Sequence, residues 1–179
     1  LFVSTAGSDK LITIEADSGV VLGRVAVDAT PRGVALISAN DGSPRQAWVL
    51  NAVENTVSLV DVSTTSNPRL VDTVVLEDPT EPVIKRGRKA FETAKASTTG
   101  TFSCASCHPD GHTDQLVWVL ETPIVTRGDQ IQPRITMPIR GLRDTEPYHW
   151  DGIPGDPYGG VNAANTDAVS YTHLTLPTT

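Results

Sequence analysis

The 179-residue sequence has no long hydrophobic run, no excess of basic residues and only two cysteines. No apolar stretch approaches the ~20 residues that a membrane-spanning helix needs, so the sequence predicts no membrane span. Lys and Arg number 14 against 21 Asp and Glu, and the net charge of -7 has the wrong sign for a phosphate-backbone binder. We therefore do not expect nucleic acid as a partner.

The residues that are present are typical of a soluble globular protein. Hydrophobic residues make up 39% and charged residues 20% of the chain, which places it outside the disordered, collagen-like and coiled-coil classes. The length suits one ordinary domain or two small ones.

Both ends of the sequence bear on how it is interpreted. The chain begins with Leu1 inside a segment that reads as a strand, so we expect the natural protein to begin upstream, where a signal peptide would lie. The last eleven residues, 169–179 (VSYTHLTLPTT), resemble the translation of a sequencing adapter. We exclude them from the fold argument as an expected artefact, and we expect the natural protein to continue past Ala168.

The first part of the chain contains an internal repeat. Residues 1–19 align with residues 47–65 at an offset of 46, which places Val3 on Val49. Each copy reads as an apolar strand, a polar turn, a β-branched strand, another turn and a third strand. Repeats of about 40 to 50 residues with several strands are typical of propeller blades. A plain antiparallel sandwich fits the same strand pattern.

These copies resemble the YVTN-type β-propeller repeat. The resemblance is carried by residues 2–8 (FVSTAGS) and 48–52 (WVLNA), and by Thr-Pro at 30–31 with the glycine that follows. It implies all-β propeller blades, which are incomplete here because two repeats cannot close a ring. We therefore expect about two blades of a partial propeller at residues 1–78, with the other blades upstream. This half has no cluster of catalytic residue types and is predicted to be a scaffold or docking surface.

The pattern changes at about Asp78. A Pro-rich junction precedes residues 83–94, which predict a helix with Thr80 as its N-cap. From there to Ala168 the strand alternation is absent, and the Pro-rich stretches need something to pack against. A large bound cofactor would supply it. We expect a second domain at residues 79–168 that is mainly α and rich in loops.

The two cysteines lie in one C-x-x-C-H sequence, Cys104-Ala105-Ser106-Cys107-His108, which is the attachment pattern for c-type haem. Within one helical turn both thiols face the same side and can bond to the two vinyl groups of a porphyrin. The imidazole of His108 can then bind the iron. A hydrogen bond from its other ring nitrogen to a backbone carbonyl would fix the tautomer.

Other interpretations of the cysteine pair stay open. It could be a redox disulfide, half of a zinc site, or a structural disulfide of an exported protein. Zinc is disfavoured because the sequence has no second C-x-x-C and no H-x3-H pair, and thioredoxin-like chemistry because no βαβ pattern surrounds the motif. Bacteria attach haem c outside the cytoplasmic membrane, so the predicted location is periplasmic or otherwise extracytoplasmic.

The residues around the motif resemble the cytochrome c domain of bacterial di-haem cytochrome c peroxidases and their MauG-like relatives. Gly87 and Phe91, residues 104–108, residues 136–142 and residues 147–152 (PYHWDG) carry the match. The resemblance implies a cytochrome c-like haem domain, electron transfer, and reduction of hydrogen peroxide or another small oxidant by the complete protein. The Trp of the last motif lies between the haems in that family, which makes Trp150 a candidate electron relay. An aromatic wedge against the porphyrin is the alternative role for Trp150.

The resemblance also implies groups and partners outside the sequence given. The family has two haem motifs, so a second haem c, and calcium, would be supplied by a C-terminal part, unless the chain is a mono-haem variant. An electron donor or acceptor protein is the expected partner. Two other functions stay open: a non-catalytic electron-transfer module for a separate dehydrogenase, and a propeller-based binding protein with a vestigial cytochrome domain.

The second axial ligand of the iron is the least determined part of the site. Met137, the only methionine, is the candidate distal ligand because a thioether opposite a histidine suits electron transfer. Its alternative role is to fill a gap in the core. His149 is the alternative distal ligand, an open position is a third possibility, and His112 is expected at the surface. Four arginines are candidates for pairing with haem propionates, at positions 127, 134, 140 and 143.

Overall fold

A computed structural model describes residues 1–97, 99–120 and 132–142 of the chain. The chain divides into two compact units, Leu1–Ser103 and Cys104–Thr179. The elements of the first unit are β1 (Phe2–Thr5), β2 (Lys10–Ile14), β3 (Val21–Ala26), β4 (Pro31–Ser38), β5 (Pro44–Asn51), β6 (Thr56–Asp61), β7 (Arg69–Val75), α1 (Pro82–Glu92) and a 3-10 turn (Ala94–Ala96). Those described in the second unit are α2 (Cys104–Cys107), a 3-10 turn (Pro109–Gly111), β8 (Val117–Leu120) and β9 (Gln132–Ile135).

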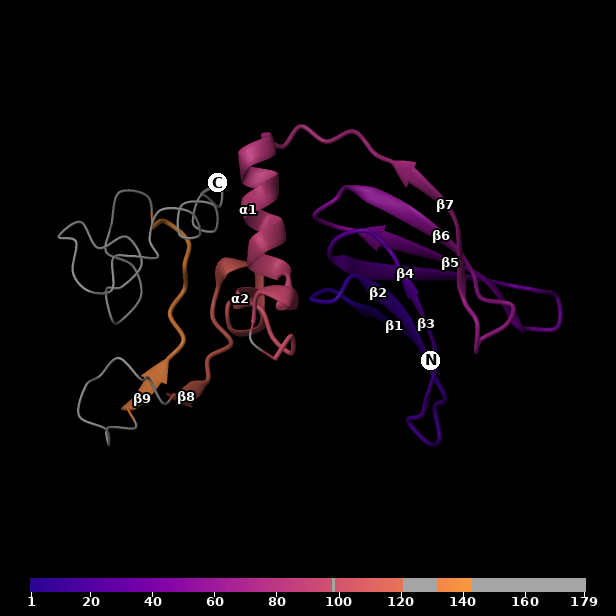
Figure 1. Cartoon of the computed structure of the whole chain (residues 1–179), viewed down its shortest axis with the longest axis horizontal. Coiled ribbons are helices and arrows are strands. Elements are labelled where there is room, and N and C mark those ends of the chain that lie inside the picture. Colours follow the sequence, from indigo (N-terminus) through magenta and orange to yellow (C-terminus); the bar gives the residue numbers. More distant parts are fainter. Residues whose placement is uncertain (98, 121–131, 143–179) are drawn as a thin grey trace. The chain divides into compact units, whose positions relative to one another are not determined.

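The first unit is built from two antiparallel sheets (Figure 1). Sheet A has the strand order β1-β2-β3 and sheet B the order β4-β5-β6-β7. The internal repeat is visible in both, because β1 to β3 correspond to β5 to β7. The turns after β1 and β5 contain Asp9 and Asn55, 46 residues apart, with left-handed φ angles of 56° and 61°. Asp and Asn are among the few residue types that tolerate this conformation without a glycine.

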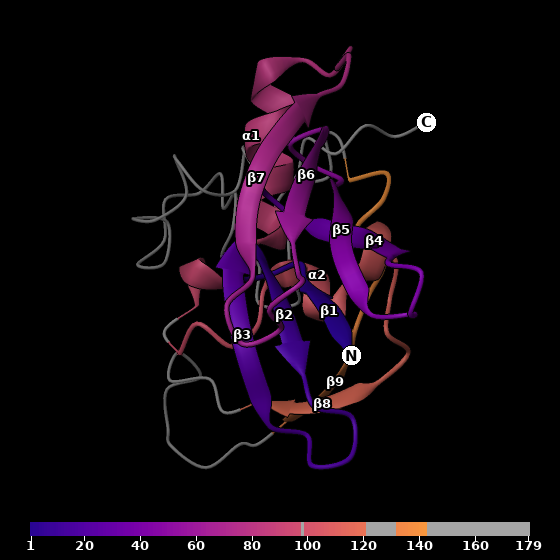
Figure 2. The ribbon, with the colours of Figure 1, turned by 90° about the vertical axis from the view of Figure 1, so that its right-hand side faces the viewer.

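The two sheets pack face to face. Leu11 of sheet A is fully buried against Ala47, Val49 and Val60 of sheet B. Burial alternates residue by residue along β5 and β6, as expected for strands with one covered face. Figure 2 shows the strands of sheet A lying along those of sheet B. The hydrophobic core of the first unit therefore lies between the two sheets, formed by the buried residue at every second position of the strands.

A row of buried polar side chains continues this core. Asn51 donates hydrogen bonds to the hydroxyl oxygens of Thr56 (3.0 Å) and Ser58 (2.9 Å). The Thr56 hydroxyl donates in turn to the carboxylate of Asp28, at 2.7 Å. These bonds replace part of those that the buried groups would make with water, which limits the cost of burying them. Within the described residues, Asn51 Oδ1 is buried without a hydrogen-bond partner.

Ion pairs and one backbone hydrogen bond hold α1 against the sheets. Lys85 pairs with Asp78 (2.9 Å) and with Glu54 (3.4 Å). The Ala94 N–H, just past the helix, donates to the Gly7 carbonyl at 2.8 Å. The helix begins with Pro82 at its first turn and has no side-chain cap, so the expected Thr80 cap is wrong. Within the described residues, no helix is both long and apolar enough to cross a membrane.

The expected fold class, incomplete propeller blades followed by a mainly α cytochrome c-like domain, is wrong. The described residues form three antiparallel sheets and two α-helices, and the sheets do not close into a propeller. Where a mainly α domain was expected, the described residues include a β-hairpin that pairs Val117 with Ile135. Strands of four residues beside prolines are too short for alternation to reveal them in a sequence. The expected domain limits, 1–78 and 79–168, stay predictions.

Gly23 lies where sheet A meets the loop before β7, and we predict that Gly23→Ala destabilises the protein. An added Cβ would lie 2.8 Å from the Thr65 carbonyl oxygen and 2.5 Å from Pro68 Cδ, contacts that the backbone there cannot easily relieve. Overpacking of this kind costs about 1–3 kcal/mol. The control is Gly33→Ala, also in a strand, where the Cβ would lie 3.5 Å from Leu50. Urea unfolding followed by circular dichroism should show a lower midpoint for the first variant only.

The Lys85 ion pairs predict a pH-dependent contribution to stability. Hydrogen bonds lower the pKa of Asp78 from 3.8 to about 2; the largest contribution comes from Lys85 and a smaller one from Thr80. A carboxyl with a lowered pKa stabilises the fold above its unfolded pKa, and this contribution is lost as pH falls through the folded value. Lys85→Met should therefore unfold at a slightly lower urea concentration than wild type at pH 7, and the difference should shrink between pH 4 and pH 2. A constant difference across that range would contradict the assignment.

Candidate functional site

The C-x-x-C-H residues form a single helical turn. α2 spans Cys104–Cys107, and the His108 N–H donates to the Cys104 carbonyl oxygen at 3.0 Å. Both cysteines are free thiols, Cys104 exposed and Cys107 partly buried. Residues three apart on a helix lie on the same side of it, so the turn presents both thiols in one direction.

His108 ends the turn. Its φ and ψ angles of -115° and 63° are not helical, as expected for a residue before proline. Its Nδ1 lies 3.4 Å from the His112 carbonyl oxygen. A carbonyl only accepts hydrogen bonds, so this contact favours the tautomer with the proton on Nδ1. Nε2 then keeps its lone pair and can act as a metal ligand.

Both thiols are protonated at neutral pH. Desolvation of the sulfur by nearby protein atoms is the main cause that raises the pKa of each thiol, and for Cys107 the nearby Asp114 carboxylate adds to the effect. Reactive redox cysteines show the opposite shift, because they need a stabilised thiolate. The environment of the pair is therefore unlike that of a redox-active disulfide site.

A tight loop follows His108. Asp110 and Gly111 both have left-handed φ angles, 52° and 76°. This reversal lets the Gly111 N–H donate to the His108 carbonyl (3.0 Å) and the Asp114 N–H donate to the Cys107 carbonyl (3.1 Å). The loop thus closes back on the turn that carries the thiols.

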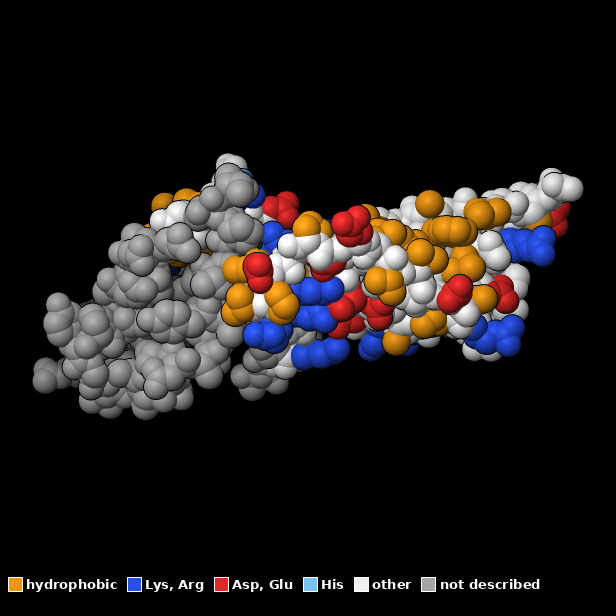
Figure 3. All heavy atoms as spheres, turned by 90° about the horizontal axis from the view of Figure 1, so that it is seen from above, with side chains coloured by type: hydrophobic (Ala, Val, Ile, Leu, Met, Phe, Trp, Pro, Cys, Tyr) orange, Lys and Arg blue, Asp and Glu red, His pale blue; other side chains and the backbone are white. Residues whose placement is uncertain are grey.

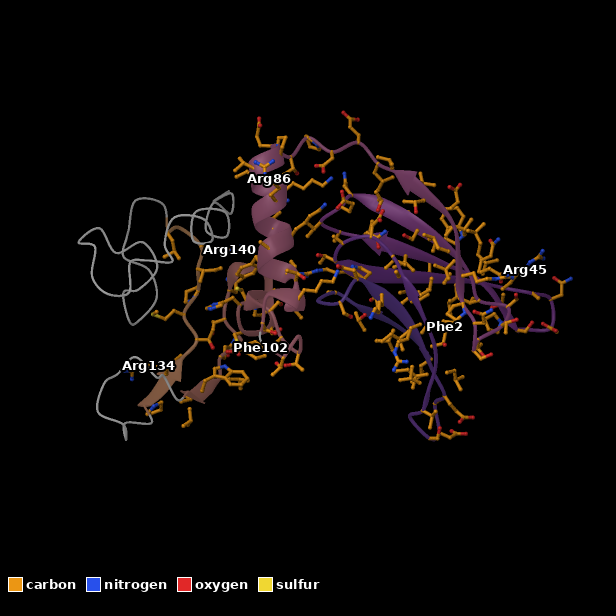
Figure 4. All side chains as sticks on the ribbon, in the orientation of Figure 1. Phe2, Arg45, Arg86, Phe102, Arg134 and Arg140 are labelled. Carbon is orange, nitrogen blue, oxygen red and sulfur yellow. The ribbon has the colours of Figure 1, made fainter. Side chains whose placement is uncertain are left out.

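Residues 136–140 are tied to this loop by hydrogen bonds. The Thr113 hydroxyl donates to the Thr136 carbonyl at 2.7 Å, and the Ile139 N–H donates to the Gly111 carbonyl at 2.9 Å. The guanidinium of Arg140 donates from two nitrogens to the Asp110 carbonyl, at 3.0 and 2.7 Å. The Arg140 side chain is labelled in Figure 4. Met137 therefore lies in a segment that is fixed at both of its ends to the loop that follows the C-x-x-C-H turn.

Asp114 organises the start of the hairpin. Its carboxylate accepts hydrogen bonds from the Leu116 N–H and from the indole N–H of Trp118, both at 2.9 Å. Desolvation acts to raise its pKa, but hydrogen bonds from Leu116, Thr136 and Trp118 outweigh it and lower the pKa. Asp114 is therefore a carboxylate at neutral pH and fixes the indole ring.

The hairpin that follows exposes apolar side chains. Val117 pairs with Ile135 and Val119 with Pro133, so these four share one face of the hairpin. Val119 is 63% and Ile135 67% exposed. Exposed apolar surface of this extent on a small unit indicates a place where another molecule or group is bound.

The structure brings together three of the predicted site residues, Cys104, Cys107 and His108. Met137 is half exposed and lies in the segment that is tied to the loop after them. His112 is exposed, as expected. Arg140 contacts the Asp110 backbone. Arg134, on β9, donates a hydrogen bond to the Pro133 carbonyl at 3.1 Å. Four predicted residues lie outside the described residues: His149, Trp150, Arg127 and Arg143.

Sequence reasoning missed Asp114, Trp118 and the role of Arg140. The four-residue spacing between Asp114 and Trp118 is compatible with a local contact, but only the turn at Gln115, with a φ of 61°, brings the two side chains together. The bond from Arg140 to Asp110 spans 30 residues and has no local signal in the sequence.

A separate cavity lies in the first unit. Its volume is about 470 Å³, and no predicted site residue lines it. The lining residues are Asp9, Ala29, Thr30, Arg86, Lys89, Ala90 and Thr93. The cavity has no nucleophile paired with a base.

Metal-ligating residues and similarity to known proteins add no further assignment. Among the described residues, no three His, Cys, Asp or Glu side chains are grouped closely enough to hold a metal ion. No protein-family model matches the chain, and no curated protein is significantly similar to it.

Proposed function

We propose that residues 104–108 attach haem c covalently and that the protein transfers electrons through it. The observation that carries the proposal is the turn itself: two free thiols three residues apart, followed by a histidine whose Nδ1 faces a backbone carbonyl. These are the groups that the attachment of haem c requires, in the required order.

The residues present fit this group in their chemistry. Cys104 and Cys107 are both reduced, so each S–H is available to add across a vinyl double bond. In this addition a carbon–sulfur bond forms, the thiol proton passes to the other vinyl carbon, and no oxidant is needed. The Nδ1 contact leaves Nε2 of His108 as the atom that would hold the iron.

The surroundings of the turn also support the proposal. A porphyrin is a large apolar ring, and its binding would cover surface such as the exposed face of the hairpin that carries Val119 and Ile135. The raised pKa values of the thiols argue against the redox alternative. When bound, haem c supplies one-electron chemistry at its iron.

The chain's own residues would tune this chemistry through their positions. The contact of His108 Nδ1 with the His112 carbonyl would orient the imidazole as a ligand. The bonds that tie residues 136–140 to the loop keep Met137 near the turn, which favours it over more distant candidates for the second axial position. Peroxide reduction and an extracytoplasmic location stay predictions of the resemblance.

Covalent attachment is tested by mass. Expression of the full chain with a haem c maturation system should give a protein heavier by one haem, and the haem should resist extraction by acidified acetone. Cys104→Ser with Cys107→Ser should abolish the adduct, whereas the control Ser106→Ala should keep it. An apo mass for the wild-type chain, or a disulfide between the two cysteines in a folded protein, would contradict the proposal.

Axial ligation by Met137 is tested by spectroscopy. If the thioether binds the iron, Met137→Ala should abolish the weak near-infrared band of a methionine–iron(III) pair and lower the reduction potential. The control is Val83→Ala, which shortens an exposed apolar side chain on α1, outside the proposed haem site, and should leave the band unchanged. A band that survives Met137→Ala would reject methionine ligation and leave covalent attachment standing.

A further inference from the structure

The face of sheet B that points away from sheet A is exposed and apolar. Trp48, Leu50 and Val74 on this face are 41%, 42% and 45% exposed. The register places them in adjacent rows, Trp48 beside Leu59 and Leu50 beside Val57 and Val74. Figure 3 shows hydrophobic side chains gathered over the strands on this side. A contiguous patch of this kind on a soluble protein indicates an interaction site.

The internal repeat indicates what kind of surface packs against the exposed face of sheet B, because each residue of sheet B has an equivalent in sheet A. At the offset of 46 residues, Trp48 corresponds to Phe2 and Leu59 to Thr13. Phe2 and Thr13 belong to the face of sheet A that packs on sheet B. The exposed face of sheet B is therefore the equivalent of a face that sheet A buries.

The opposite relation holds for the outer face of sheet A. Val3 and Ile14 lie on the side of sheet A that does not contact sheet B, and Val3 is 37% exposed. Their equivalents in sheet B, Val49 and Val60, are fully buried against sheet A. The two faces that pack against each other inside the molecule therefore each have an exposed equivalent. The outer face of sheet B is equivalent to the inner face of sheet A, and the outer face of sheet A is equivalent to the inner face of sheet B.

Charge on the two exposed faces is complementary. Arg24 shares a row with Val3 on the outer face of sheet A, and Lys10 lies in the next row. Asp72 lies in the row of Trp48 on the outer face of sheet B. Opposite charges on two faces favour their pairing over the pairing of either face with itself.

We infer that the exposed face of sheet B binds the outer face of sheet A of a second copy of this chain, head to tail. The contact would repeat between molecules the packing that sheets A and B make within one molecule. Such an interface is heterologous, so each bound copy offers a further free face and association does not stop at a dimer unless a ring closes.

The size of the face sets the expected affinity. Four strands about 4.8 Å apart and some six residues about 3.3 Å apart give a face on the order of 400 Å² in plan. Stable complexes bury about 800 Å² of accessible surface per partner, so this contact is at the low end. We expect weak association, observable at tens to hundreds of micromolar protein.

Sedimentation velocity of the full chain tests the inference. The wild-type chain should show an average mass that rises with concentration and passes the dimer. Trp48→Asp should remove the sheet B face and Val3→Asp the sheet A face, and each variant alone should be monomeric. An equimolar mixture of the two should form a dimer that does not grow, because one intact face remains on each partner.

Control variants distinguish this head-to-tail association from association through other exposed apolar residues. Val83→Asp changes an equally exposed apolar residue on α1, 45% exposed, and should associate like wild type. If circular dichroism shows that Trp48→Asp is unfolded, Leu50→Asp replaces it. Three results would overturn the inference: a wild-type monomer up to several hundred micromolar, a Val3→Asp variant that still associates alone, or a mixture that stays monomeric.

Discussion

The site depends on one hydrogen bond, from the His108 N–H to the Cys104 carbonyl oxygen. This bond closes the single helical turn that puts both thiols on one side and places the imidazole directly after them. Pro109 prevents the helix from continuing, so the backbone at His108 leaves the helical region and the ring can meet the His112 carbonyl. Without this turn the two cysteines would have no fixed relation to the histidine.

The loop after the turn preserves this arrangement. A helix of four residues is too short to be stable by itself, because nucleation costs more than one hydrogen bond returns. The Asp114 N–H donates a hydrogen bond to the Cys107 carbonyl, and the guanidinium of Arg140 donates to the Asp110 carbonyl. Hydrogen bonds from outside the helix therefore stabilise the turn. The site is therefore rigid through its surroundings more than through its own secondary structure.

The strand repeat and the cysteine–histidine turn could be predicted from the sequence, and the predictions that were wrong have physical reasons. The strand repeat was found because alternation in strands such as β6 is a local signal, and the cysteine–histidine turn because its spacing is fixed by the helix. The α-rich second domain was wrong because short strands beside prolines, such as β9, carry no such period. The contact of Arg140 with Asp110 spans 30 residues and depends on tertiary structure. The prediction of a Thr80 cap was wrong because α1 begins at Pro82, a residue favoured at the first helical position, so that Glu81 and not Thr80 occupies the N-cap position.

Both units expose apolar surface. The other residues of each unit are the basis on which we propose a different ligand for each surface. The hairpin face with Val119 and Ile135 belongs to the same unit as two free thiols and a histidine whose Nδ1 lies near a backbone carbonyl, and the haem that we propose would account for this face. The face with Trp48 belongs to the first unit, Leu1–Ser103, whose sequence contains no cysteine and no histidine. It has an equivalent in the same chain, already buried by a sheet whose other side is open. Since apolar area alone is non-directional, the polar groups at the first surface and the repeat at the second are what make each assignment specific.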